Sequence, residues 1–275
     1  MADKRKLRAA ALQLTSGTDV EANLAAAGEL IAEAAQDGAE LIVLPENFSF
    51  LGATDADRLA AAEREGDGPA QRFLVEQARA FGVFIVGGTI PVSADSKLAK
   101  SRSYLMGPDG QVIAAYDKIH LFDVDVPNTS GEAYQESATT IPGARPVVAS
   151  TAVASIGLSV CYDLRFPALF HRLGQMGMEI LAIPAAFTVP TGRVHWRPLL
   201  TARAVESLTF VVASAQCGEH AGGRQTYGHS MILDPWGAVL DEIELGTGFA
   251  IADLDMMRQV ELRQQFPTLS HRREL

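Results

Sequence analysis

The chain has 275 residues, enough for one large domain or two small ones with a substantial hydrophobic core. Its hydrophobic fraction of 48% and charged fraction of 20% are ordinary for a globular protein and exclude a mainly disordered chain. The 33 acidic and 23 basic residues give a net charge of −10, which argues against a nucleic-acid or anionic-membrane partner, because such partners need a basic surface.

The two cysteines, Cys161 and Cys217, are too few for a disulfide framework and fit a reducing compartment. The first apolar run, residues 7–14, is too short and too polar for a signal peptide. Nothing later approaches the roughly 20 apolar residues of a membrane span. We therefore expect a cytoplasmic protein with no membrane partner.

Strand-like and helix-like segments alternate along the whole chain. Thr18 and Glu21 form a capping-box pattern that opens an alanine-rich helix, and Pro69 opens a second helix that ends before Gly82. In chain order, the first half predicts a strand at 7–14, a helix from 18 to about 38, a strand at 41–44, a helix at 69–81, a strand at 83–89, and hairpin strands at 102–106 and 111–117.

The second half continues the alternation after a polar loop at 126–145. It predicts a strand at 156–160, a helix after Pro167, a strand at 180–184, a helix at 194–208, strands at 210–215, 231–233, 238–241 and 248–253, and a C-terminal helix. Alternating strands and helices predict an α/β protein, and the hairpins indicate mixed sheets. With no repeat or linker, one domain over residues 1–275 is the economical interpretation.

Several common signatures are missing from the sequence. It holds no P-loop, no complete G-x-G-x-x-G and no zinc-binding spacing among its six histidines, so we expect neither a cofactor nor a metal. Gly228 and Ser230 begin a serine nucleophile elbow, but Ile232 stands where its last glycine belongs.

Three reactive side chains each follow an apolar strand: Glu46, Lys118 and Cys161. Taken singly, each has a structural interpretation, as a capping carboxylate, a solvated hairpin lysine and a small buried hydrophobe. The carboxyl ends of strands are where ligands collect in α/β sheets, so the three groups are placed to converge. Together they supply a thiol nucleophile, a base for its proton and a cation for an oxyanion.

The segments around these residues resemble the three signature segments of the nitrilase superfamily of carbon–nitrogen hydrolases. They are residues 45–48 (Pro-Glu-Asn-Phe), 117–123 (Asp-Lys-Ile-His-Leu-Phe-Asp) and 161–167 (Cys-Tyr-Asp-Leu-Arg-Phe-Pro), and the resemblance extends from about residue 7 to 273. It implies a four-layer α-β-β-α sandwich with two mixed β-sheets, no cofactor, and a homodimer or higher homo-oligomer.

The resemblance also implies a mechanism. Cys161 would attack an amide carbonyl and form a thioester, and Glu46 would carry the thiol proton to the departing ammonia and later activate water. Lys118 and the backbone N–H of Tyr162 would stabilise the oxyanion. Glu136 matches a second glutamate that orients the lysine; the alternative is a solvated loop carboxylate.

Segments 201–206, 215–220 and 227–237 are similar to the branch that hydrolyses amides of small α-keto acids. Tyr162 stands where true nitrilases carry tryptophan, which favours an amide over a nitrile. By resemblance, Arg165 would grip a keto-acid carboxylate, while Phe187 and Thr191 would form part of the acyl pocket. The structural alternatives are an ion pair of Arg165 with Asp163 or another structural carboxylate, and ordinary loop packing for the other two.

The expected reaction is hydrolysis of deaminated glutathione to 2-oxoglutarate and cysteinylglycine, which makes the expected partner a small-molecule amide. Three alternatives stay open: an ω-amidase acting on 2-oxoglutaramate or 2-oxosuccinamate, an amidase for other small amides, and a catalytically idle binding or scaffold protein. Intact Glu46, Lys118 and Cys161 argue against the last of these.

Overall fold

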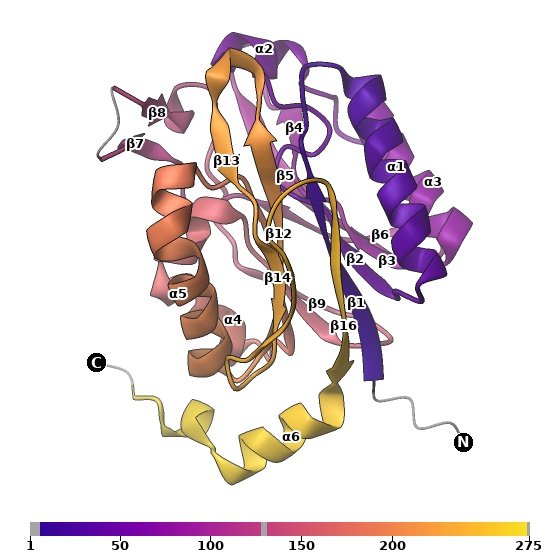
Figure 1. Cartoon of the computed structure of the whole chain (residues 1–275), viewed down its shortest axis with the longest axis vertical. Helices are drawn as coiled ribbons and strands as arrows, with labels where there is room; N and C mark the ends of the chain where they lie inside the picture. The colour runs from indigo at the N-terminus through magenta and orange to yellow at the C-terminus, as the bar shows by residue number, and fades with distance from the viewer. Residues whose placement is uncertain (1–5, 128–130, 274–275) are drawn as a thin grey trace.

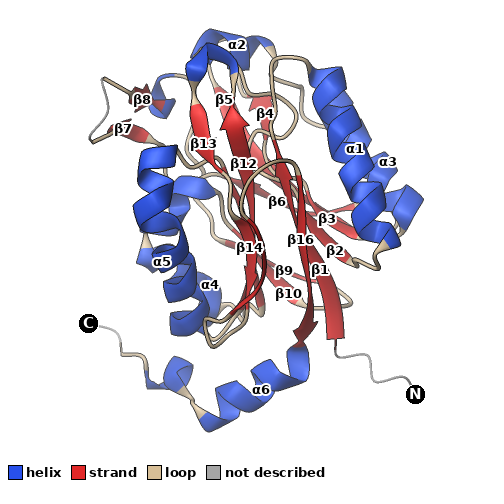
Figure 2. Ribbon diagram, in the orientation of Figure 1, coloured by secondary structure: helices blue, strands red, loops and turns tan. Residues whose placement is uncertain are grey.

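The computed structural model describes residues 6–127 and 131–273 as an α/β structure (Figures 1 and 2). Its strands are β1 (Lys6–Leu14), β2 (Leu41–Val43), β3 (Phe84–Val86), β4 (Ile90–Ser93), β5 (Ala99–Met106), β6 (Val112–Asp117), β7 (Asp123–Asp125), β8 (Ala133–Gln135), β9 (Val147–Ser150), β10 (Ser155–Leu158), β11 (Ile180–Ala185), β12 (Phe210–Glu219), β13 (Gln225–Tyr227), β14 (Ser230–Leu233), β15 (Val239–Ile243) and β16 (Gly248–Asp255). Its α-helices are α1 (Val20–Gln36), α2 (Asp55–Ala60), α3 (Pro69–Phe81), α4 (Pro167–Gln175), α5 (Val189–Ser207) and α6 (Met256–Gln265). Short 3₁₀ turns are η1 (Glu136–Ala138), η2 (Cys161–Arg165), η3 (Ala221–Gly223) and η4 (Thr268–His271).

The strands form one large mixed sheet and a separate hairpin, β7–β8. The backbone of the large sheet runs in the order β4-β5-β3-β2-β1-β12-β11-β10-β9. Its two halves pair only where the last two residues of β1 lie beside the middle of β12, with Gln13 opposite Ala215 and Leu14 opposite Gln216. The expected sandwich of two mixed sheets is therefore confirmed, and these two residue pairs join the sheets into one continuous ladder.

Successive residues of β1 face two different cores, as the two-residue period of a strand requires. Ala9 and Ala11 belong to the larger core, which includes residues of β10, β11, β12, α4 and α5. Ala10 and Leu12 belong to the second core, formed with α1 and α3. Figure 1 shows the consequence, with α1 and α3 on one outer side of the sheets and α4 and α5 on the other.

The predicted elements agree with the structure except at some boundaries and short strands. The N-cap of α1 is Asp19, whose side chain accepts a hydrogen bond from the Ala22 N–H, and not Thr18. Helix α5 begins at Val189, five residues before the predicted start, because Pro190 fits its first turn. Sequence analysis missed α2, β4, β7, β8, β9 and β13, which are short and carry little hydrophobic periodicity.

Within the described ranges, the helices are all too short or too polar to cross a bilayer.

Candidate active site

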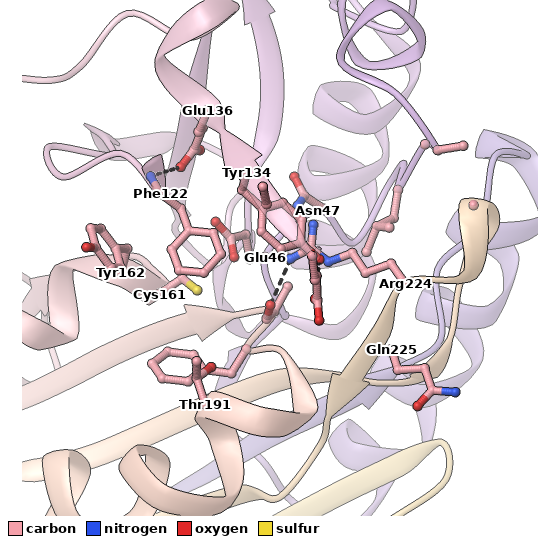
Figure 3. A pocket seen from close by; sticks show the side chains of 18 of the residues that line it. Glu46, Asn47, Phe122, Tyr134, Glu136, Cys161, Tyr162, Thr191, Arg224 and Gln225 are labelled. Atoms are coloured by element: carbon pink, nitrogen blue, oxygen red, sulfur yellow. Dashed lines mark hydrogen bonds between the residues drawn. The ribbon is translucent and has the colours of Figure 1, made fainter. Parts of the chain in front are cut away.

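The three reactive side chains singled out in the sequence line one cavity of about 1010 Å³ at the strand ends. Figure 3 shows two of them, Glu46 and Cys161. Glu46 follows β2, Lys118 follows β6, and Cys161 follows β10 at the start of η2. The cavity is also lined by Glu136, Tyr162, Arg165, Phe187 and Thr191, so every candidate site residue from the sequence faces the same space.

Cys161 stands on a sharp turn with a φ of 46°, an uncommon conformation for a residue with a side chain. The turn is held by Asp163, whose buried carboxylate accepts hydrogen bonds from the backbone N–H of Val160 at 2.9 Å and of His120 at 2.9 Å. Tyr116 donates its hydroxyl to the same carboxylate at 2.6 Å. These contacts fasten the cysteine turn to β6 and to the segment that carries Lys118.

Lys118 is 2% exposed and lies between two carboxylates. Its Nζ is 2.8 Å from Oε1 of Glu46 and 2.8 Å from Oε2 of Glu136. Burial alone would lower the pKa of Lys118, but the charges of Glu136 and Glu46 outweigh it and hold that pKa well above its usual value. The lysine is therefore an ammonium ion, a form that could stabilise a developing negative charge in the cavity.

Glu46 is 4% exposed and is positioned through its own backbone and that of its neighbour. The Gln216 amide donates to the Glu46 carbonyl oxygen at 3.0 Å, and the Thr89 hydroxyl accepts from the Asn47 N–H at 2.8 Å. Gly88 lies against this turn so closely that a Cβ there would be 2.1 Å from the Pro45 carbonyl oxygen. The turn that carries the Glu46 carboxylate is thus held by the loop after β3 and by β12.

The Cys161 thiol is buried and its pKa is raised well above the usual value. Burial is the main cause, and the charge of Glu46 adds to it. The Lys118 ammonium and a hydrogen bond from the Ala186 backbone act in the opposite direction. Cys161 is therefore a neutral thiol with the Glu46 carboxylate within hydrogen-bonding reach.

Glu136 is not the solvated loop carboxylate of the alternative interpretation. Its side chain is 18% exposed, and Oε2 accepts both from Lys118 and from the Phe122 N–H at 2.8 Å. Because this oxygen contacts the lysine and the backbone of the next segment at once, it restrains the ammonium group. Figure 3 shows the hydrogen bond between Phe122 and Glu136.

Arg165 does not pair with Asp163, whose carboxylate contacts Tyr116, His120 and Val160, so the ion pair with Asp163 is wrong. Nη1 of Arg165 is 3.1 Å from Nδ1 of His195, and its guanidinium carbon lies 5.7 Å from the Tyr162 ring centre and 5.2 Å from that of Phe187. Burial and the Arg165 charge lower the pKa of His195, so its imidazole is neutral and its Nδ1 is free to accept. The arginine is thereby oriented by aromatic faces on the cavity wall.

The two residues expected in the acyl pocket differ in their surroundings. Phe187 is 6% exposed and packs on Trp196 with ring centres 4.9 Å apart, which makes it part of the core as well as of the cavity wall. Thr191 shares a 2.9 Å hydrogen bond with Thr188 in the first turn of α5. Cys217 is buried beneath Gly228, away from the residues that line the cavity.

Sequence reasoning did not identify the positioning role of Asp163 or the contact from Ala186. The position of Asp163 could have indicated this role, since it lies two residues after Cys161 in a buried turn. Ala186 had none, because it acts through its backbone. Among residues 6–127 and 131–273, no group of three His, Cys, Asp or Glu side chains is arranged to hold a metal ion.

Comparison with known proteins identifies close relatives. The family model for carbon-nitrogen hydrolase matches residues 8–264. Deaminated glutathione amidase of Synechocystis is 44% identical over 268 residues, covering 96% of this chain and 97% of the relative. Human deaminated glutathione amidase is 40% identical over 271 residues, covering 96% and 81%.

Solved structures of related proteins also superpose on this chain. Saccharomyces cerevisiae Nit3, a nitrilase-superfamily member, superposes with a TM-score of 0.86 at 28% identity, covering 96% of this chain and 95% of that one. A mutant of the Nesterenkonia amidase carries acrylamide, joined by Michael addition, on its active-site cysteine. It superposes with a TM-score of 0.79 at 28% identity, covering 94% and 99%.

Proposed function

Since the chain belongs to the carbon–nitrogen hydrolase family, and is thus a hydrolase of carbon–nitrogen bonds in amides, we propose that it cleaves deaminated glutathione by a cysteine mechanism. The products are 2-oxoglutarate and cysteinylglycine. The observation that carries the proposal is the buried contact of Lys118 with Glu46 and Glu136 beside the Cys161 thiol. This arrangement contains a nucleophile, a base and a cation within one cavity.

Acylation begins with the neutral thiol. As the Cys161 sulphur attacks the amide carbonyl, its proton passes to Glu46, and the carbonyl oxygen becomes an oxyanion. Lys118 and the Tyr162 N–H stabilise that oxyanion. Glu46 then gives the proton to the amine nitrogen, the carbon–nitrogen bond breaks, and a thioester remains on Cys161.

Deacylation uses the same groups in reverse. Water attacks the thioester, Glu46 takes one of its protons, and Lys118 again faces the oxyanion. The carbon–sulphur bond then breaks, and the proton returns from Glu46 to the Cys161 sulphur. The carboxylic acid leaves with the second proton of the water, which it gives up to solvent to become a carboxylate. Glu136 is a positioning residue in both halves, because it contacts the lysine and not the reacting atoms.

The choice of substrate rests on the relatives and on the size of the cavity. The relatives named above are deaminated glutathione amidases. A cavity of about 1010 Å³ accommodates a molecule of tripeptide size, whereas 2-oxoglutaramate would leave most of it filled with water. Arg165, held over aromatic rings, is the group we assign to the keto-acid carboxylate.

Replacing the nucleophile tests the mechanism. Cys161→Ala is expected to lower release of 2-oxoglutarate from deaminated glutathione by at least roughly 1000-fold. Cys217→Ala is the matched control, because it removes the second buried thiol outside the cavity, and it is expected to retain turnover. A Cys161→Ala enzyme with half of the wild-type rate would end the proposal.

Specificity constants test the substrate. We expect kcat/KM for deaminated glutathione to exceed that for 2-oxoglutaramate, measured as 2-oxoglutarate formed from each. The reverse order would make the protein an ω-amidase with the same chemistry.

A further inference from the structure

Arg224, between η3 and β13, is a cavity-lining cation that the proposed chemistry does not use. Its Nη2 donates to the Ala186 carbonyl oxygen at 2.9 Å, and its guanidinium carbon lies 5.0 Å from the Tyr134 ring centre. Its buried Nε has no hydrogen-bond partner among the described residues. A guanidinium offers five N–H donors, so this one is held in place with most of its donors unused.

Arg224 and Arg165 contact two consecutive residues near Cys161, Ala186 and Phe187. The Ala186 backbone hydrogen-bonds Cys161 and also accepts from Arg224, whereas the ring of the next residue, Phe187, lies under Arg165. Both guanidinium groups therefore contact the two-residue segment that lies beside Cys161.

A row of three aromatic rings connects the two arginines along the cavity wall. Tyr134 under Arg224 is 5.1 Å from Phe122, and Phe122 is 5.1 Å from Tyr162, which lies beside Arg165. A molecule lying along this row would meet apolar ring faces in its middle and a cation at each end. A chain of three residues spans at most about 10 Å, which is the scale of such a row.

The leaving amine of the substrate lies at the Arg224 end of this row of rings. Glu46 must reach the departing nitrogen, so the amine lies on the side of the segment that follows Glu46. The Arg224 loop packs on that segment, since a Cβ at Gly222 would be 3.1 Å from the Ala53 side chain. Figure 3 shows Arg224, Tyr134 and Glu46 converging on the same part of the cavity.

We propose that Arg224, stacked on Tyr134, binds a carboxylate at the far end of the leaving amine, which makes the substrate a dianionic amide with one carboxylate at each end. This inference rests on the proposed amidase function and deepens it. Burial raises the pKa of Tyr134 to about 12, so the phenol stays protonated and donates to Glu132 at 2.7 Å. This hydrogen bond holds the Glu132 carboxylate against Tyr134. The Arg224 guanidinium is then available to bind the carboxylate of the ligand.

The test compares two substrates and two variants. The substrates are deaminated glutathione and its C-terminal carboxamide, which differ only in the leaving-group carboxylate. The variants are Arg224→Gln and Arg193→Gln; the second removes an exposed arginine from the cavity rim and controls for loss of one positive charge.

Arg224→Gln is expected to lower kcat/KM for deaminated glutathione by about 10- to 100-fold, mainly through KM, because a charge-assisted hydrogen bond is lost. For the carboxamide the same variant is expected to change kcat/KM less than about threefold. Arg193→Gln should act weakly and equally on both substrates. Equal losses on both substrates with Arg224→Gln would overturn the inference.

A binding measurement separates this inference from the proposed function. Calorimetry with cysteinylglycine and its carboxamide is expected to give tighter binding of the free acid to wild type, and no such preference in Arg224→Gln. If wild type hydrolyses neither amide, the proposed function fails, and the calorimetric preference still decides the Arg224 site. Equal binding of both dipeptides to wild type would contradict the site even in an active enzyme.

Discussion

At the scale of residues, the proposed chemistry depends on a neutral thiol beside a carboxylate. It does not use a thiolate–imidazolium pair. Burial and the charge of Glu46 raise the pKa of Cys161, and the Lys118 ammonium offsets only part of that increase. The nucleophile is therefore generated as it attacks, when its proton moves to Glu46. In the proposed mechanism, Glu46 thus disfavours the thiolate of the resting enzyme and then accepts the thiol proton during attack.

Glu46→Gln should separate these two effects. Removing the carboxylate charge lowers the pKa of Cys161, so alkylation by iodoacetamide at pH 8 should accelerate by roughly tenfold for each unit by which the pKa falls, while amide hydrolysis is lost. In wild type, the alkylation rate should keep rising with pH beyond about 8.5, the ordinary thiol pKa.

Two variants control this measurement. A Cys217→Ala background leaves Cys161 as the single thiol. Lys118→Met removes the charge that lowers the pKa of Cys161 and should slow alkylation. Slower alkylation in Glu46→Gln than in wild type would contradict the account.

Arg165→Met should raise KM for 2-oxoglutaramate and deaminated glutathione by about 10- to 100-fold, because the keto-acid carboxylate loses a charged donor. A neutral amide of the same length should be affected far less. Steady-state kinetics on the three amides checks this expectation. Equal effects on all of them would make Arg165 a structural residue.

At the scale of elements, the turns that follow the strands carry the site residues. These turns are also where the structure adds most to what the sequence predicts. The predicted strands placed Glu46, Lys118 and Cys161 at strand ends, and the structure has them there. The contacts that aim them come from residues distant in sequence, such as Gln216 to the Glu46 backbone. Such contacts leave no periodic pattern in the sequence, so they could not be predicted.

Gly88→Ala should disturb the Glu46 turn, whereas Gly82→Ala should not. Both glycines have positive φ, but a Cβ at Gly88 would be 2.1 Å from the Pro45 carbonyl oxygen, and one at Gly82 would meet no described atom within 4 Å. Gly82→Ala should cost about 1–2 kcal/mol of unfolding free energy from backbone strain alone.

Gly88→Ala should cost more, because the Pro45 backbone must also move, and it alone should lower kcat. Thermal unfolding and turnover of both variants test this expectation. Equal unfolding temperatures with unchanged kcat would show that Gly88 does not position Glu46.

At the scale of the whole molecule, the net charge of −10 contrasts with the lining of the cavity. Five cationic side chains face it, against three carboxylates: Arg58, Lys118, Arg165, Arg193 and Arg224 against Glu46, Glu132 and Glu136. Composition argues against nucleic acid as a partner, but it could not reveal this local excess of cations, since segments distant in sequence bring the charges together. Local contacts, and not the overall field, must attract an anionic substrate.

The resemblance that identified the family also leads us to propose a homodimer or a higher homo-oligomer. Size-exclusion chromatography with light scattering should then give a mass of about 59 kDa or a multiple of it, since one chain has 29.4 kDa. A mass of 29.4 kDa throughout the working concentration range would contradict this proposal.

The central claim is that amide hydrolysis passes through a thioester on Cys161. Its most direct test is acid quenching of the wild-type enzyme during turnover of deaminated glutathione, followed by peptide mass spectrometry. The account predicts a 2-oxoglutaryl adduct on the peptide that contains Cys161, removable by hydroxylamine and absent from Cys161→Ala. Turnover with an unmodified Cys161, or with the adduct on Cys217, would contradict it.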